Sequence, residues 1–405
     1  MGDKIALESR YGATNYAPLP VVLSRGEGVW LWDEDGRRYL DMLSAYSAVS
    51  FGYGHPKLVR VLAEQAQRLA VTSRAFHSDT LGPFLQKLCE LTGMDRALPM
   101  STGAEAVETA IKCSRKWAYT VKKVPDGMAE IVCAYGNFHG RTSTIVGFSS
   151  EAQYKQHFGP FCDGFRSIPF GDARALEAAI TPNTAAFLVE PIQGEAGIVL
   201  PPEGYLTQCA RICRERNVLL IVDEVQTGLG RTGRFLACEH EGVKPDGITL
   251  GKALGGGLLP VSAFVAREEV MGVFRPGDHG STFGGNALGA AVGRAALDVL
   301  VEENLAARAA AMGDYLLKRL RSISSPIVAD VRGKGLLVGV ELVASVPARG
   351  FVETLLKHGV LSKDTHGTVA RFAPPLVITR DEIDWGVQQI REAVREYGPV
   401  YERAA

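Results

Sequence analysis

Lys252 has the surroundings that most clearly indicate chemistry in this chain. It follows an apolar run at 247–250 and leads into three consecutive glycines at 255–257. An apolar setting favours the neutral amine of a lysine, which can then attack an aldehyde. Another apolar run, at 218–222, ends in Asp223. A lysine that forms a Schiff base and a carboxylate that keeps a pyridine nitrogen protonated are the groups that pyridoxal phosphate requires, so this pair predicts a site for that cofactor.

Two small turns could hold the phosphate of such a cofactor. Gly103 and Ala104 lie at the expected start of a helix, where free backbone N–H groups and the helix dipole favour an anion. The hydroxyl-rich turn at 280–286 contains Ser281 and Thr282. Either turn could also be an ordinary helix cap or loop, so neither decides the matter alone.

Further side chains could contact a cofactor ring or a substrate. Phe138 could stack on a ring, and Arg141 offers a two-pronged donor for a carboxylate; core packing and a surface ion pair are the alternatives. The intervening His139 could be a base, but it has no second ligand nearby and is more simply a hydrogen-bonded filler. Glu195 follows an apolar strand, and Arg371 precedes two prolines. Two arginines fit one ligand with two carboxylates, or two ligands used in turn.

Two alternative interpretations compete with the cofactor site. Lys252 could be a solvated surface charge, as most lysines are. The segment 228–233 formally matches the dinucleotide fingerprint GxGxxG. That fingerprint should directly follow a strand and open a βαβ unit, with an acidic residue farther on, and none of these conditions is met here. The pattern therefore argues against a nicotinamide cofactor.

The composition indicates a globular protein with two domains. The 405 residues exceed one small core, while 46% hydrophobic and 22% charged residues are ordinary values. A net charge of −1 favours neither nucleic acid nor a membrane surface as a partner. The start of the chain lacks signal-peptide features, and the seven cysteines lack metal-type spacing, so we expect reduced thiols in a cytoplasmic protein without a bound metal.

The order of apolar runs predicts an α/β fold. Between about 50 and 290, short apolar runs alternate with amphipathic stretches, which favours a largely parallel sheet with its site at the carboxyl ends of the strands. We expect an N-terminal arm at 1–46, a large domain at 47–290 and a small α+β domain at 291–405. The small domain should contain a long helical stretch to 323, a strand at 336–342 and a final helix. Thr379 and Glu382 form the capping box of that helix.

Over essentially its full length the chain resembles the class III, fold-type I pyridoxal phosphate-dependent aminotransferases, and most closely their ornithine branch. The resemblance is carried by segments 11–20, 44–49, 72–76, 101–106, 189–197, 223–228, 247–260, 279–285 and 365–377. Tyr16, Tyr46 and the segment 73–76 are the more specific to the ornithine branch. The resemblance implies a seven-stranded, mostly parallel sheet in the large domain.

The resemblance also implies cofactor roles for individual residues. Lys252 would be the Schiff-base lysine and proton shuttle, and Asp223 would pair with the pyridine nitrogen. The other implied cofactor contacts are the backbone of Gly103 and Ala104, the ring face of Phe138, the amide of Gln226, and the hydroxyls of Ser281 and Thr282. Because Thr282 would reach the phosphate of the partner subunit, a homodimer is the smallest active unit expected.

The implied substrate residues are Tyr16, Tyr46, Arg141, Glu195 and Arg371. Arg141 and Tyr16 would hold the α-carboxylate and α-amino groups of ornithine, and Tyr46 would shape the pocket. Arg371 would pair with Glu195 while ornithine is bound, and would then bind the α-carboxylate of glutamate or 2-oxoglutarate.

The implied activity is δ-amino transfer from L-ornithine to 2-oxoglutarate. It gives glutamate 5-semialdehyde, which cyclises to pyrroline-5-carboxylate, and glutamate, with ping-pong kinetics in proline formation or arginine breakdown. His139 departs from the tryptophan expected in animal ornithine enzymes and matches acetylornithine aminotransferases, whereas Tyr46 favours the ornithine branch. The alternatives are therefore an acetylornithine or other ω-amine aminotransferase, an aminomutase on the same scaffold, and a cofactor-binding regulator without turnover.

Overall fold

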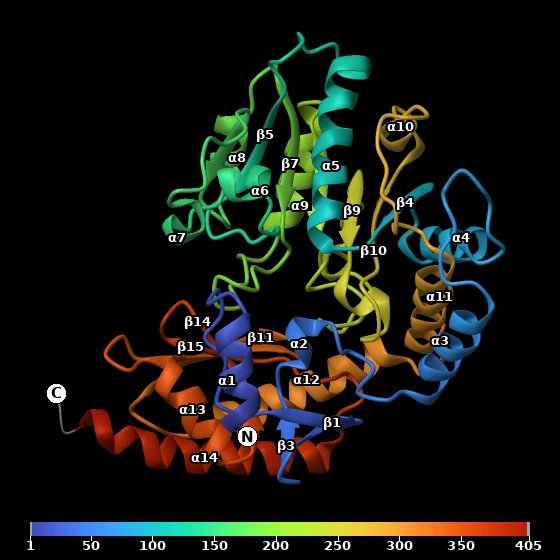
Figure 1. The fold of residues 1–405 in the computed structure, drawn as a ribbon. Helices are drawn as coiled ribbons and strands as arrows, with labels where there is room; N and C mark the ends of the chain where they lie inside the picture. Colours follow the sequence, from blue (N-terminus) through green and yellow to red (C-terminus); the bar gives the residue numbers. More distant parts are fainter. Residues whose placement is uncertain (1, 403–405) are drawn as a thin grey trace.

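The computed structural model describes residues 2–402 and is built around one central sheet (Figure 1). Its strands, in chain order, are β4 (Arg96–Met100), β5 (Glu130–Ala134), β6 (Phe165–Ile168), β7 (Thr184–Val189), β8 (Leu219–Asp223), β9 (Gly247–Leu250) and β10 (Ser262–Ala266). Their spatial order is β4-β10-β9-β8-β7-β5-β6. The five neighbouring strands β6, β5, β7, β8 and β9 pair in parallel. Strand β10 is antiparallel to both of its neighbours, β4 and β9. This confirms the predicted α/β fold with a mostly parallel seven-stranded sheet.

Helices cover both faces of this sheet, which explains why its strands are continuous apolar runs. Along β5, Ile131 and Cys133 pack into one hydrophobic core and Val132 into the other, as the two-residue period of a strand requires. One face is covered by α5 (Gly103–Trp117), and the other by α8 (Ala173–Ala179) and α9 (Tyr205–Glu215). The carboxyl ends of the parallel strands are left free to carry a site.

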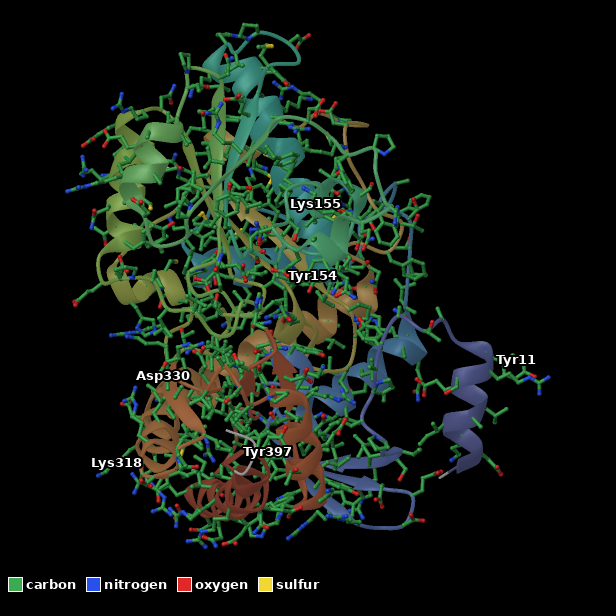
Figure 2. The ribbon with its side chains drawn as sticks, turned by 90° about the vertical axis from the view of Figure 1, so that its left-hand side faces the viewer. Tyr11, Tyr154, Lys155, Lys318, Asp330 and Tyr397 are labelled. Carbon is green, nitrogen blue, oxygen red and sulfur yellow. The ribbon has the colours of Figure 1, made fainter. Side chains whose placement is uncertain are left out.

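The N-terminal segment forms a second, smaller sheet with a strand from the far end of the chain. Strands β1 (Leu23–Glu27), β2 (Trp30–Asp33) and β3 (Arg38–Asp41) are followed in spatial order by β13 (Val360–Leu361). The short strand predicted near Trp30 is confirmed. The sequence did not predict helix α1 (Gly2–Tyr11), which stands away from the body of the molecule in Figure 2.

The C-terminal part combines helices with the sheet β11-β12-β15-β14. Its strands are β11 (Val328–Lys334), β12 (Leu337–Leu342), β14 (Lys363–Thr365) and β15 (Val369–Phe372), and its helices are α11 (Ala287–Glu302), α12 (Leu305–Arg321), α13 (Ala348–Lys357) and α14 (Arg380–Glu402). The expected long helical stretch to 323 is broken, because Asn304 adopts a left-handed conformation between α11 and α12. The final capping box is confirmed, since the Glu382 carboxylate accepts from the Thr379 amide at 2.8 Å and the Thr379 hydroxyl accepts from the Glu382 amide at 3.3 Å.

Short elements complete the chain. They are α2 (Ser44–Ser47), α3 (Pro56–Arg68), α4 (Leu81–Thr92), α6 (Ser143–Gly147), α7 (Ala152–Lys155), α10 (Glu268–Met271), the 3-10 turns η2 (Ala237–Glu241) and η3 (Lys252–Gly255), and the π-turn η1 (Ala118–Lys122). The division of the chain into domains at 46 and 290 stays a prediction. None of the described helices is both long and apolar enough to span a membrane.

Candidate active site

Lys252 lies at the carboxyl end of β9, where the chain turns sharply. Its φ is +45°, a left-handed conformation that a lysine adopts only when its surroundings impose it. Burial lowers the pKa of its amine, against the carboxylate of Glu195, which raises it. Within residues 2–402 this amine forms no hydrogen bond or ion pair. Lys252 is thus a partly buried amine without a partner, and its neutral, nucleophilic form is favoured.

Asp223 lies at the carboxyl end of the neighbouring strand β8, and its Cα pairs with Thr249 of β9. Its carboxylate is almost fully buried and accepts three hydrogen bonds, from the Val225 amide at 3.0 Å, the Thr249 hydroxyl at 2.9 Å and His139 Nδ1 at 2.7 Å. A carboxylate has about four acceptor positions, so one remains for a further donor. Asp223 is therefore a fixed, buried acceptor beside the lysine.

His139 belongs to the site, although its sequence context indicated only a filler. Burial alone would lower the pKa of this imidazole, but the hydrogen bond and charge of Asp223 raise it overall. Its Nε2 atom is buried without a partner. Nearby, Glu190 accepts from the Phe138 amide at 3.0 Å, and burial raises the pKa of Glu190 to about 7. The partner of His139 lies on another strand, so no local sequence signal could reveal the contact.

The start of α5 lies against the segment that carries Lys252. Thr102 caps this helix, and its own backbone amide is occupied by the carboxylate of Glu105 at 2.7 Å. The next amides, of Gly103 and Ala104, have no acceptor within the helix. A Cβ on Gly103 would lie 2.9 Å from the Val225 side chain, so only glycine allows this approach. Two free amides at a helix start next to an amine form a site for an anion.

Glu195 and Arg371 form a short, largely buried ion pair. Arg371 Nη1 donates to Glu195 Oε1 at 2.6 Å, and the arginine side chain is only 4% exposed. Burial would raise the pKa of Glu195, but the charge of Arg371 and this hydrogen bond lower it overall. Gln226 Nε2 also donates to Glu195, at 3.3 Å. The ionised form of the carboxylate is therefore favoured, and it occupies the Arg371 guanidinium.

Tyr46 covers the same arginine from an unusual turn. Its ring lies 4.7 Å from the Arg371 guanidinium. The four residues of α2, Ser44–Ser47, all have positive φ, so they form a left-handed turn without a glycine. Asp41 stabilises the turn by accepting from the amides of Leu43 and Ser44, both at 2.8 Å. Tyr46 thus lies beside Arg371, in a conformation that the sequence did not predict.

Arg141 is held differently from Arg371. It is exposed, and no carboxylate among the described residues pairs with it. Its guanidinium instead lies 3.7 Å from the ring of Tyr154 and 5.6 Å from that of Phe138. The two rings meet edge to face, with centroids 6.2 Å apart. Tyr154 was not predicted as a site residue, because a tyrosine in a polar loop has no distinguishing sequence signal.

Three predicted site residues do not contact these groups within the single chain. Thr282 is exposed, and Ser281 accepts from the Gly284 amide at 3.0 Å rather than from a group near Lys252. Tyr16 is 78% exposed, and it contributes to the raised pKa of the nearby Tyr46 hydroxyl, which burial mainly causes. Nothing in one chain tests their roles, so these roles stay predictions.

The residues present fit pyridoxal phosphate. The Lys252 amine could bond to its aldehyde, Asp223 has one acceptor position left for a pyridine N–H, and the start of α5 could bind its phosphate. The buried Oε1 of Gln226 has no partner, as expected of a group that awaits a ring hydroxyl. A Cβ on Gly194 would lie 1.6 Å from this oxygen, so glycine there leaves room for the Gln226 side chain in this position.

The fold and the site together define a family. The chain matches the aminotransferase class-III family over residues 11–394 and belongs to it. It is 56% identical over 387 residues, covering 96% of both chains, to the ornithine aminotransferase of Bacillus subtilis. These findings confirm the family that the sequence motifs predicted, and with it an aminotransferase.

Solved structures agree with this assignment. The structure of the ornithine aminotransferase from Toxoplasma gondii, with partial occupancy of pyridoxal phosphate, matches with a TM-score of 0.97 at 45% identity, covering 100% of this chain and 96% of that one. The structure of acetylornithine aminotransferase from Elizabethkingia anophelis matches with a TM-score of 0.89 at 46% identity, covering 97% and 98%. The fold is thus shared by enzymes for both donors.

Proposed function

We propose that this chain transfers the δ-amino group of L-ornithine to 2-oxoglutarate with pyridoxal phosphate as cofactor. The observation that carries the proposal is the unequal state of the two arginines. Arg371 is neutralised by Glu195 at 2.6 Å, whereas Arg141 has no anionic partner in the described chain. A donor with a single carboxylate is therefore directed to Arg141, and this leaves its distant amine to react. The relatives named ornithine aminotransferase support the same donor.

The cofactor supplies an aldehyde for the substrate amine and a ring that accepts electrons. Lys252 would hold the cofactor through that aldehyde, and its free amine would accept a proton from the substrate Cδ. The lowered pKa of this amine favours its neutral form, which can accept a proton. Asp223 would accept the pyridine N–H, and His139 holds the Asp223 carboxylate in place. Each group is positioned at the end of a buried strand or in the loop that follows one.

Glu195 must change partners between the two halves of the reaction. While it covers Arg371, ornithine cannot bind backwards through its α-carboxylate. Glutamate or 2-oxoglutarate brings a second carboxylate, which displaces Glu195 and takes its place on Arg371. A charge-assisted contact of this kind contributes about 1.5–3 kcal/mol. Arg141 and Arg371 together thus fit the dicarboxylate, and Arg141 alone fits ornithine.

A homodimer completes the proposed enzyme. Thr282 is exposed in the single chain, as expected of a residue that reaches the phosphate bound by a second copy. We place the enzyme in the cytoplasm, because its seven cysteines form no disulfide and five of them are buried.

An acetylornithine aminotransferase is the second candidate. His139 and the likeness to the Elizabethkingia enzyme at 46% identity favour it, while Tyr46 beside Arg371 and the 56% identical relative favour ornithine. Both donors present the same α-carboxylate to Arg141, so that contact does not separate them.

A donor panel tests the proposal. The purified enzyme is given 2-oxoglutarate with ornithine, N-acetylornithine or a simple ω-amine, and glutamate formation is measured. We expect the highest kcat/KM with ornithine and the appearance of pyrroline-5-carboxylate. Preference for N-acetylornithine would replace the first candidate by the second, and turnover without 2-oxoglutarate would indicate an aminomutase.

A further inference from the structure

Tyr154 lies beside the proposed substrate arginine but has no role in the function described so far. It belongs to the one-turn helix α7 (Ala152–Lys155), on the side of the sheet-bearing part that faces the C-terminal part (Figure 2). Its side chain is half-buried. The Arg141 guanidinium lies over its ring at 3.7 Å, the shortest distance between a cation and a ring among the described residues.

This contact explains how an exposed arginine can be held in place without a counter-ion. A free arginine side chain loses about 2 kcal/mol of rotamer entropy when it is fixed. Stacking on an aromatic ring offsets part of this loss and uses only the flat face of the guanidinium. The N–H groups at its edge stay available for a carboxylate. An ion pair, such as the one at Arg371, would have occupied them.

Tyr154 is itself held by its neighbours. Its ring meets that of Phe138 edge to face, with centroids 6.2 Å apart and planes at 80°. Burial raises the pKa of its hydroxyl, the positive charge of Arg141 and a side-chain hydrogen bond from Arg141 lower it, and the charges of Glu195 and Glu151 raise it. The tyrosine therefore lies within electrostatic reach of Arg141 and of Glu195, the carboxylate that covers Arg371.

We propose that Tyr154 is a positioning residue that holds Arg141 ready for the donor carboxylate farthest from the reacting amine. This inference rests on the proposed function, because it takes Arg141 as the site of that carboxylate. The aromatic face does the positioning, so the ring matters more than the hydroxyl. The residue acts on substrate binding and leaves the proton transfer at Lys252 unchanged.

The test is a double-mutant cycle on the cofactor-loaded enzyme, in which Tyr154→Leu, Arg141→Met and the double variant are compared with wild type. The donor is whichever of ornithine and N-acetylornithine the wild type prefers, since both carry the α-carboxylate. We expect Tyr154→Leu to lower kcat/KM about tenfold, mainly through KM. In the Arg141→Met background, Tyr154→Leu should change kcat/KM by less than about twofold, because its target is gone.

Tyr154→Phe is the matched control and should keep kcat/KM within about threefold of wild type, because the ring remains. Equal melting temperatures confirm that the partly exposed position does not unfold the chain. The inference is overturned if Tyr154→Leu leaves kcat/KM unchanged, or if its effect persists in the Arg141→Met background. It is also overturned if Tyr154→Leu lowers kcat and leaves KM unchanged. If the donor assigned in the proposed function is wrong, the donor panel with the wild-type enzyme shows it. Failure of the proposed function is therefore distinguishable from failure of this inference.

Discussion

Asp223, His139 and Glu190 form a buried cluster whose charges depend on one another. Asp223 and Lys252 could be predicted from the sequence, because each ends an apolar run and strand ends define the site in a parallel sheet. The Asp223–His139 contact at 2.7 Å could not be predicted, because Asp223 ends β8 and His139 lies in the loop after β5, far away in the chain. Glu190 also ends a strand, but its raised pKa arises from burial, which only the folded chain shows.

Glu190→Gln should stabilise the protein at alkaline pH and not at acid pH. Burial raises the pKa of Glu190 from 4.5 to about 7. Below pH 4.5 the carboxyl is neutral in both the folded and the unfolded chain. Between pH 4.5 and about pH 7 it ionises only in the unfolded chain, so the free energy of unfolding falls as pH rises through this range. Glutamine removes this loss, which amounts to about 1.4 kcal/mol per pKa unit.

The measurement is chemical denaturation of wild type and variant at about pH 5 and about pH 8, with exposed Glu203→Gln as control. We expect the advantage of Glu190→Gln to grow between the two pH values, and that of the control to stay constant. An equal difference at both pH values would show that the pKa of Glu190 is not raised.

At the scale of elements, the left-handed turn Ser44–Ser47 is the least predictable feature. The resemblance predicts that Tyr46 shapes the substrate pocket, and the structure places its ring 4.7 Å from the Arg371 guanidinium. Four consecutive positive φ values without glycine oppose ordinary backbone preference by about 1–2 kcal/mol per residue, so no propensity argument could foresee them. The turn forms because buried partners hold it. Asp41 accepts from the amide of Ser44 and from that of Leu43 just before the turn, and the Ser44 hydroxyl donates to the Ala373 carbonyl at 2.6 Å.

Glycine substitutions in and beside this turn should have opposite effects. Ala45, within the turn, is exposed and has a φ of +46°. Ala48, just after the turn, has an ordinary φ of −76°. Ala45→Gly relieves strain and should leave the free energy of unfolding unchanged or raised by up to ~1 kcal/mol. Ala48→Gly should lower it by about 0.5–1 kcal/mol. Thermal unfolding of both variants checks this, and equal destabilisation would contradict the strained turn.

Across the whole molecule, Arg231 connects three distant segments. It is fully buried and donates to the carbonyls of Leu336 at 3.0 Å and Pro374 at 2.5 Å, and to the hydroxyls of Ser44 at 3.2 Å and Ser50 at 3.1 Å. Burial lowers its pKa to about 9. The segment 228–233 thus joins the parts that carry Tyr46 and Arg371. The sequence argued against a nicotinamide site there but gave no sign of this role, because all four acceptors are remote in the chain.

Arg231→Met should lower the free energy of unfolding by about 3 kcal/mol or more, because it leaves several buried oxygens without a donor. Arg234→Met, at an exposed position of the same segment, is the matched control and should change it by less than about 0.5 kcal/mol. Denaturant titration of both variants provides the values. Similar stabilities would show that Arg231 does not connect these segments.

The central claim is that Glu195 masks Arg371 and so directs ornithine to react through its δ-amine. Its most direct test is stopped-flow measurement of a single half-reaction, in which the absorbance of the bound cofactor is followed after mixing with either ornithine or glutamate. Glu195→Gln removes the charge that covers Arg371 and keeps a similar shape. We expect the glutamate half-reaction to become at least about tenfold faster relative to the ornithine one, since a charge-assisted contact no longer has to be displaced. An unchanged ornithine-to-glutamate ratio would contradict the account and leave Glu195 as a structural partner of Arg371.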